Sequence, residues 1–270
     1  METGDWITAD VPLDQYNAAR MYDYMLGGYH NFEVDRQVAQ RILMLSPESP
    51  VQAQANRAFL RRAVTWLAQQ GIDQFLDIGS GIPTAGNVHE VAQKVNPAAR
   101  VVYVDIDPVA VIHSKAILHG NTHVLAIQGD LAAPEAIIHH PECERFLDLS
   151  RPVGLLLFAV LNFIYDNEQV YGLVSTLRQA LASGSYLAIT HITDEDAPPE
   201  IVERLRRLAA GSKSPTRIRS RAEIAPFFTG LDMVEPGLVH IPLWRPEGPD
   251  DLFLDRPSGS MILGGIGRKP

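Results

Sequence analysis

Three carboxylates stand at or near the ends of three short apolar runs, and each could hold a different polar part of a ligand. Asp77, two residues before a glycine, suits an ammonium group and would repel a pyrophosphate. Asp105 ends the second run, 105 − 77 = 28 residues later, where a carboxylate can accept hydrogen bonds from two ribose hydroxyls. Asp130 follows the third run and can accept the exocyclic amine of an adenine. Their order therefore predicts one ligand with an amine, a ribose and an adenine.

A glycine-containing turn follows the first apolar run. Gly79 and Gly81 let backbone N–H groups approach a ligand, and a helix predicted to begin near Ala85 offers further unpaired N–H groups. Thr84, after a proline, stands where a dinucleotide-binding fingerprint carries its third glycine. Together with Asp77, this departure favours S-adenosylmethionine (SAM), whose methionine part has an amine and a carboxylate, over a nicotinamide cofactor.

The apolar runs must be strands that end at one edge of a sheet if these side chains are to meet. The runs are continuous rather than alternating, as in strands covered on both faces, and each connection is long enough for a helix. This pattern predicts an α/β fold with a parallel sheet. The predicted strands cover residues 75–78, 101–104, 123–127, 153–158 and 186–190, with two more at 231–234 and 260–266.

The part of the chain before the first predicted strand is helical in pattern. The spacing of its apolar and aromatic residues predicts helices over residues 14–26, 33–45 and 51–70, the first ended by Gly27 and Gly28. We therefore predict two regions: residues 1–70 form an N-terminal helical extension or lid, and residues 71–270 form the ligand-binding domain.

Three motifs carry a resemblance to a known family. They are RMYDYMLGGYHNF at residues 20–32 with Asp35 and Arg36 after it, NRAFLRR at residues 56–62, and PTAGNVHE at residues 83–90. From Gln74 to its end the chain resembles the class I SAM-dependent methyltransferases. Over nearly its whole length it resembles a bacterial family described only as S-adenosyl methyltransferase, which brings no known substrate.

The resemblance implies an α/β, Rossmann-like fold: a mostly parallel seven-stranded sheet flanked by helices, its last strand antiparallel, with the N-terminal helical extension added. It also implies that the protein binds SAM and releases S-adenosylhomocysteine (SAH). The implied cofactor contacts are Asp77, Gly79, Asp105 and Asp130, and along the same strand-end turns Gly81, Thr84, Asn87, Ile106, Gly129, Leu131 and Ala159. In the extension, we expect Tyr22, Tyr24 or Tyr29 to lie near the sulfonium as a cation–π or hydrogen-bonding surface.

Methyl transfer is an in-line displacement, which needs a base only if the acceptor must lose a proton. Asn162 follows the fourth predicted strand, where many relatives carry His; Asn can orient a nucleophile but cannot take its proton. His30, in the extension, and His191, after the fifth strand, are the candidate bases. These three are the predicted catalytic residues. No metal site is predicted, because the cluster from His139 to Cys143 matches no recurrent zinc spacing.

Composition narrows the class of partner. Among 270 residues, 23 Lys and Arg stand against 32 Asp and Glu, a net charge of −9, which argues against a broad grip on nucleic acid or on an anionic membrane. A small-molecule partner is therefore expected. Cys143 is alone, the first residues lack the basic flank and apolar run of a secretory signal, and no apolar run approaches the ~20 residues of a membrane helix, so we expect a cytoplasmic protein. The sequence also allows a homodimer.

Methyl transfer from SAM to a small molecule is the leading hypothesis; oxygen or nitrogen is the favoured acceptor atom, and carbon acceptors remain open. A module that binds the cofactor without transferring methyl is the first alternative, since no base is evident. A nicotinamide-dependent oxidoreductase is disfavoured by Asp77 and Thr84. A nucleic-acid methyltransferase is disfavoured by the net charge and by the absence of an Asn/Asp-Pro-Pro-Tyr/Phe signature after the fourth strand.

Overall fold

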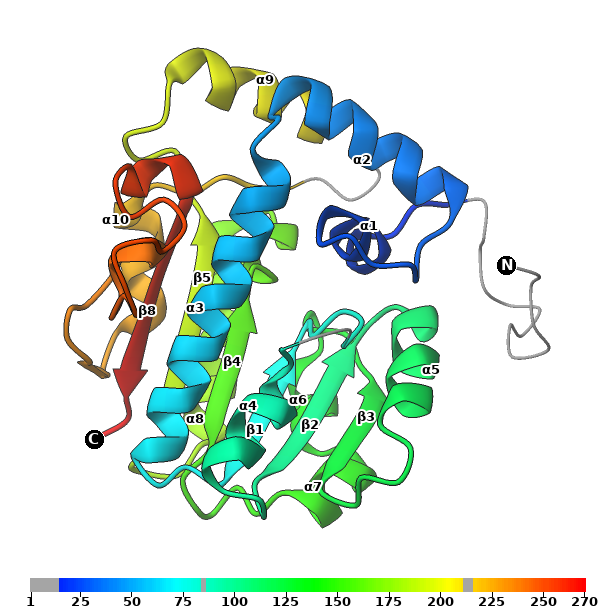
Figure 1. Cartoon of the computed structure of the whole chain (residues 1–270). Coiled ribbons are helices and arrows are strands. Elements are labelled where there is room, and N and C mark those ends of the chain that lie inside the picture. Colours follow the sequence, from blue (N-terminus) through cyan, green and yellow to red (C-terminus); the bar gives the residue numbers. More distant parts are fainter. Residues whose placement is uncertain (1–14, 84–85, 211–215) are drawn as a thin grey trace.

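One mixed sheet organises the protein, with strands in the order β3-β2-β1-β4-β5-β8-β6 and with β7 also paired to β8 (Figure 1). The structure, a computed structural model, describes residues 15–83, 86–210 and 216–270. Five strands are parallel to one another: β1 (Gln74–Ile78), β2 (Arg100–Asp105), β3 (Val124–Gln128), β4 (Gly154–Phe158) and β5 (Tyr186–Ile192). The predicted parallel α/β sheet is confirmed.

The last strand, β8 (Ile262–Arg268), runs antiparallel to β5 along its full length, as expected. Its other side pairs with two short strands, β6 (Asp232–Met233) near its end and β7 (Val239–His240) near its start. The edge that we predicted as one strand is therefore divided, because the chain leaves the ladder between Met233 and Val239. The sheet has eight strands in place of the expected seven.

Helices cover both faces of the sheet, which explains why the strands carry mainly apolar residues on both faces. Side chains alternate along β1: Phe75 packs with α3 (Ser49–Gln69) and α4 (Val88–Val95), whereas Leu76 and Ile78 pack in the opposite layer. That second layer contains α6 (Pro134–Ile138), α7 (Pro141–Phe146) and α8 (Asn167–Ala180). Two further helices complete the connections, α5 (Pro108–Ile117) and α10 (Arg221–Ile224), with 3-10 turns at Leu161–Phe163, Ala225–Phe228, Ile241–Leu243 and Pro257–Ser260.

Three helices lie beyond the carboxyl ends of the parallel strands: α1 (Ala18–Met25), α2 (Glu33–Leu45) and α9 (Pro199–Ala210) (Figure 1). The predicted helix over residues 33–45 matches α2, and α3 begins two residues before its predicted start. Among the described helices of the region predicted as a lid, α1 and α2 lie over the strand ends. The third helix, α3, shares a hydrophobic core with the sheet through residues such as Phe59 and Leu67.

A buried ion cluster attaches α1 to both α2 and the sheet. The Arg20 Nε atom lies 3.4 Å from a carboxylate oxygen of Asp35, in α2, and 3.6 Å from one of Asp107, in the turn between β2 and α5. All three residues are buried. Because a buried charge without its partner is costly, these contacts fix α1 close to the strand end that carries Asp105.

Candidate functional site

The carboxyl ends of the parallel strands and the helices above them enclose a cavity of about 760 Å³, which we call the strand-end cavity. Its sheet side is formed by the ends of β1, β2, β3 and β4 with the turns after them, and its other side by α1, α2 and the start of α3. Such volumes are typical of small-molecule sites, ~300–1,000 Å³. The predicted cofactor contacts that line it are Tyr22, Asp77, Gly79, Gly81, Asp105, Ile106, Gly129, Asp130, Leu131 and Ala159.

Asp77 is the most perturbed carboxylate on the cavity wall. Burial raises its pKa from 3.8 to about 7; the positive charge of Arg57 lowers the pKa and the negative charge of Asp105 raises it. A carboxylate in such a setting binds a proton or a cationic ligand more tightly than one in water. The site thus has the property expected of an ammonium-binding group.

Arg57 also lines the cavity, although the sequence alone suggested no role for it. It comes from α3, lies over the Tyr22 ring at 5.7 Å, and is near enough to Asp77 to act on its pKa. A guanidinium beside a carboxylate offers opposite charges to a ligand that carries both an ammonium and a carboxylate. The only signal in the sequence was its place in the motif at residues 56–62, which gives no hint of its proximity to Asp77.

The turn after β1 is built around Asp105. Gly81 N–H donates to one Asp105 carboxylate oxygen at 2.8 Å, and Asp107 N–H donates to the other at 2.9 Å. Burial raises the pKa of Asp105 to about 6, and both hydrogen bonds act in the opposite direction. Gly79 has φ +74°, and a Cβ there would lie 2.2 Å from Val160, so only glycine lets the turn pass beneath the cavity.

The third strand supplies Asp130 at the cavity wall, beside Gly129 and Leu131. One Asp130 carboxylate oxygen accepts a hydrogen bond from the Ala132 N–H at 2.8 Å. Asn87, expected to contact the cofactor, is not among the residues that line the cavity; it precedes α4, and its N–H donates to Glu90 at 3.0 Å. Thr84 falls outside the described residues.

Asn162 lines the cavity and is buried. Its Nδ2 donates to the Ala159 carbonyl at 3.0 Å, and its Oδ1 has no hydrogen-bond partner among the described residues. Ala159 has the left-handed φ of +52°, and its N–H donates to the Thr190 carbonyl at the end of β5. A buried acceptor without a partner is costly unless a ligand or water supplies a donor, so Oδ1 is suited to bind an N–H or O–H group.

Neither predicted histidine base lies on the cavity wall. Alternation along β5 turns Ile192 toward the cavity and His191 toward the opposite layer, where its ring stacks on Phe227 and its Nε2 lies 2.9 Å from Arg219. Burial lowers the pKa of His191 to about 4. His30 packs edge-on against the ring of His113, on α5, at 4.6 Å. Their positions therefore give no support to a role as base for either residue.

Of the three tyrosines expected near the sulfonium, only Tyr22 lines the cavity. Its hydroxyl donates to the Ala53 carbonyl at 3.1 Å and accepts from Asn56 Nδ2 at 3.2 Å. The ring is therefore held in place as an aromatic surface. Tyr24 packs in the small core between α1 and α2, and Tyr29 is 81% exposed.

The groups on the wall fit SAM: a glycine turn lies beneath a cavity bordered by Asp77, Asp105 and Asp130, with Asn162 Oδ1 left for a donor. The fold and these strand-end carboxylates define a SAM-dependent methyltransferase. The chain belongs to the S-adenosyl methyltransferase family, whose model matches residues 5–270.

Two solved structures are similar over nearly the whole chain. A DUF574 family protein from Streptomyces avermitilis is 39% identical with a TM-score of 0.90, over 96% of this chain and 99% of that one. A candidate methyltransferase from Thermobifida fusca is 39% identical with a TM-score of 0.91, over 98% and 99%. Human N-acetylserotonin methyltransferase in complex with SAM, 14% identical with a TM-score of 0.51 over 92% and 62%, shares the fold. No curated protein matches this chain.

Among the helices that the structure describes, none combines the length and the apolar character that crossing a bilayer would need.

Proposed function

We propose that this protein binds SAM in the strand-end cavity and transfers its methyl group to an oxygen or nitrogen of a small molecule. The observation that carries the proposal is the meeting of Asp77, Asp105 and Asp130 on the wall of one cavity. In this proposal, Asp77 binds the ammonium group, Asp105 accepts the ribose hydroxyls, and Asp130 accepts the adenine amine. Arg57 binds the carboxylate of the methionine part.

The cavity divides by polarity in a way that leaves room for an acceptor. The three carboxylates lie on the side of β1, β2 and β3, whereas Ile192, Leu205 and Ile218 line the side of β5 and α9. This apolar side favours an acceptor with an apolar body, because burying apolar surface is the main favourable term in binding it. Asn162 lies at the end of β4, between the two sides.

When bound, SAM supplies a methyl carbon activated by a positively charged sulfur. The protein then has to align the acceptor with that carbon and exclude water. Asn162 Oδ1 can accept a hydrogen bond from the acceptor's O–H or N–H and so direct its lone pair. Since no histidine lines the cavity among the described residues, we infer an acceptor that needs no histidine base and can release its proton to water.

The first experiment identifies the cofactor and its ribose contact. We expect SAH to raise the melting temperature, because a ligand at ~100 times its Kd adds ~2.7 kcal/mol to the free energy of unfolding. The substitution Asp105→Ala should weaken SAH binding about tenfold to a hundredfold, since hydrogen bonds to a charged group contribute ~1.5–3 kcal/mol. The matched control is Asp166→Ala, which removes an exposed carboxylate that caps α8 through Gln169. A shift with NAD and none with SAH, or equal losses in both variants, would contradict the assignment.

The second experiment tests methyl transfer and the role of Asn162. Phenols, amines and carboxylic acids with apolar rings are incubated with radiolabelled SAM, and labelled products are counted. We expect turnover with a subset of these acceptors, and Asn162→Ala should lower kcat at least about tenfold with less than a threefold change in the Kd for SAH. Binding of SAM without turnover on any acceptor would favour the alternative of a cofactor-binding module.

A further inference from the structure

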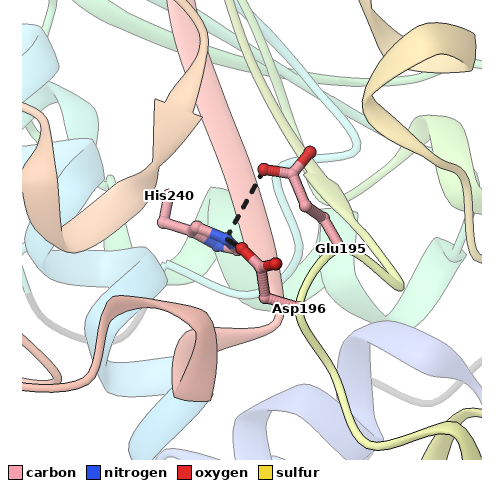
Figure 2. A group of neighbouring side chains, drawn as sticks. All are labelled: Glu195, Asp196 and His240. Atoms are coloured by element: carbon pink, nitrogen blue, oxygen red, sulfur yellow. Dashed lines mark ion pairs between the residues drawn. The ribbon is translucent and has the colours of Figure 1, made fainter.

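A second group of ionisable side chains lies apart from the proposed cofactor contacts. Glu195 and Asp196 follow β5 in the loop that leads to α9, and His240 is the last residue of β7. One carboxylate oxygen from each acid and one ring nitrogen of the histidine all lie within 4.8 Å of one another (Figure 2). The methyl transfer proposed above uses none of these residues.

The histidine in this group lacks the partners that a buried imidazole needs. The His240 side chain is only 7% exposed, and neither of its ring nitrogens has a hydrogen-bond partner among the described residues. Its Nε2 lies between the two acids, 3.8 Å from Glu195 Oε1 and 3.7 Å from Asp196 Oδ2 (Figure 2). Both separations are too long for hydrogen bonds, so the nitrogen faces a gap that another atom could fill.

A metal ion fits that gap. Zinc binds nitrogen and oxygen ligands at ~2.0–2.2 Å, which places two ligands of a tetrahedral site about 3.4 Å apart. The observed separations of 3.7 and 3.8 Å exceed this by a few tenths of an ångström, which small side-chain rotations can remove. Three protein ligands with a water molecule in the fourth position is a common arrangement for zinc.

The surroundings also favour a dication. Arg221 binds Glu195 through two hydrogen bonds, from Nε at 2.7 Å and from Nη2 at 2.5 Å, and so holds this carboxylate in one orientation. The Asp196 side chain is 71% exposed. The two carboxylates together carry a charge of −2, which a dication would match.

We propose that Glu195, Asp196 and His240 bind one divalent transition-metal ion, with Zn²⁺ the best match to one imidazole and two carboxylates. The bound ion would join β7, at the edge of the sheet, to the loop before α9, whose Leu205 lines the strand-end cavity. The sequence concealed this site because His240 comes 240 − 196 = 44 residues after Asp196. Ligands so far apart in the sequence do not form a short motif that can be recognised.

The test measures metal binding by the full-length chain without a polyhistidine tag. After treatment with EDTA and exhaustive dialysis, the protein is titrated with ZnCl₂, and bound zinc is determined by equilibrium dialysis and elemental analysis. We expect about one Zn²⁺ per chain and a higher melting temperature in its presence. Millimolar Mg²⁺ should not displace the ion, because an imidazole ligand favours zinc over magnesium.

The variants assign the ligands. Asp196→Asn keeps the shape of an exposed residue whose φ is +55°, a conformation that Asn tolerates, and should weaken Zn²⁺ binding at least about tenfold. His240→Asn should abolish stoichiometric binding; should this buried substitution fail to fold, Asp196→Asn still decides. The control is His139→Ala, which removes an exposed histidine that pairs with Glu144 at 3.0 Å, and it should bind zinc as the natural chain does.

Two results would overturn the proposal. One is the absence of stoichiometric zinc at about 100 µM metal, a concentration at which a specific three-ligand site would be filled. The other is Zn²⁺ binding that is as tight in Asp196→Asn as in the natural chain.

Discussion

Replacing Asp77 with Asn should weaken SAH binding by about a hundredfold to a thousandfold and should make the cofactor-free protein more stable. The loss of affinity follows because the ion pair with the ligand's ammonium is removed inside a buried site, at ~3–4 kcal/mol. The protein becomes more stable because burying an ionised carboxylate with a pKa near 7 costs free energy, and the neutral amide of Asn at this position does not carry that cost. Binding is measured by calorimetry, and stability by urea unfolding at pH 8.

The raised pKa of Asp77 also predicts how the free energy of unfolding and the affinity for SAH change with pH. Between pH 3.8 and about 7 the folded protein binds the Asp77 proton more tightly than the unfolded chain does, so the free energy of unfolding falls as the pH rises through this range. The effect on the ligand is opposite: the ammonium needs the ionised carboxylate, so SAH affinity should fall below pH 7, by up to about tenfold per pH unit. In the Asp77→Asn variant both dependences should be reduced.

Asp166→Ala serves as the control for affinity, since this carboxylate caps α8 far along the chain from the glycine turn. An Asp77→Asn variant that binds SAH as tightly as the natural protein would show that the ammonium group is held elsewhere. Lower stability in the variant, with retained binding, would indicate a structural role for this carboxylate.

Arg57→Ala should weaken SAH binding about thirtyfold to a hundredfold while leaving 5′-methylthioadenosine binding unchanged. The second compound keeps the adenosine and the sulfur but lacks the amino and carboxyl groups that Arg57 and Asp77 would hold. Loss of a charged hydrogen-bonded pair costs ~2–3 kcal/mol, which gives the expected change for SAH. The contrast between the two ligands separates a contact with the methionine part from a general distortion of the cavity.

A second readout follows from the electrostatics of the pair. Arg57 lowers the pKa of Asp77, so its removal should move the pH below which SAH affinity falls to a higher value. The control is Arg61→Ala, one turn further along α3 and exposed. Equal losses for SAH and 5′-methylthioadenosine, or equal effects of the two substitutions, would exclude a carboxylate-binding role for Arg57.

Much of the fold could be predicted because local patterns of apolar residues in the sequence indicate its strands and helices. The strands are buried on both faces, so they read as continuous apolar runs, and β1 to β5 and β8 lie where these runs predict them. The division of the edge into β6 and β7 was not predictable, because each is only two residues long and leaves no periodic signal.

The sequence by itself determined the sheet, the helices before it and the positions of Asp77, Asp105 and Asp130, since parallel strands bring their carboxyl ends to one edge. Only the tertiary structure decided which side chains meet there. Packing of α3 on the sheet brought Arg57 to Asp77, and strand alternation turned His191 away from the cavity. The loop after β5 and the edge strand β7 brought Asp196 and His240 together. These contacts join elements distant in sequence, and their geometry follows from packing, which local residue patterns do not encode.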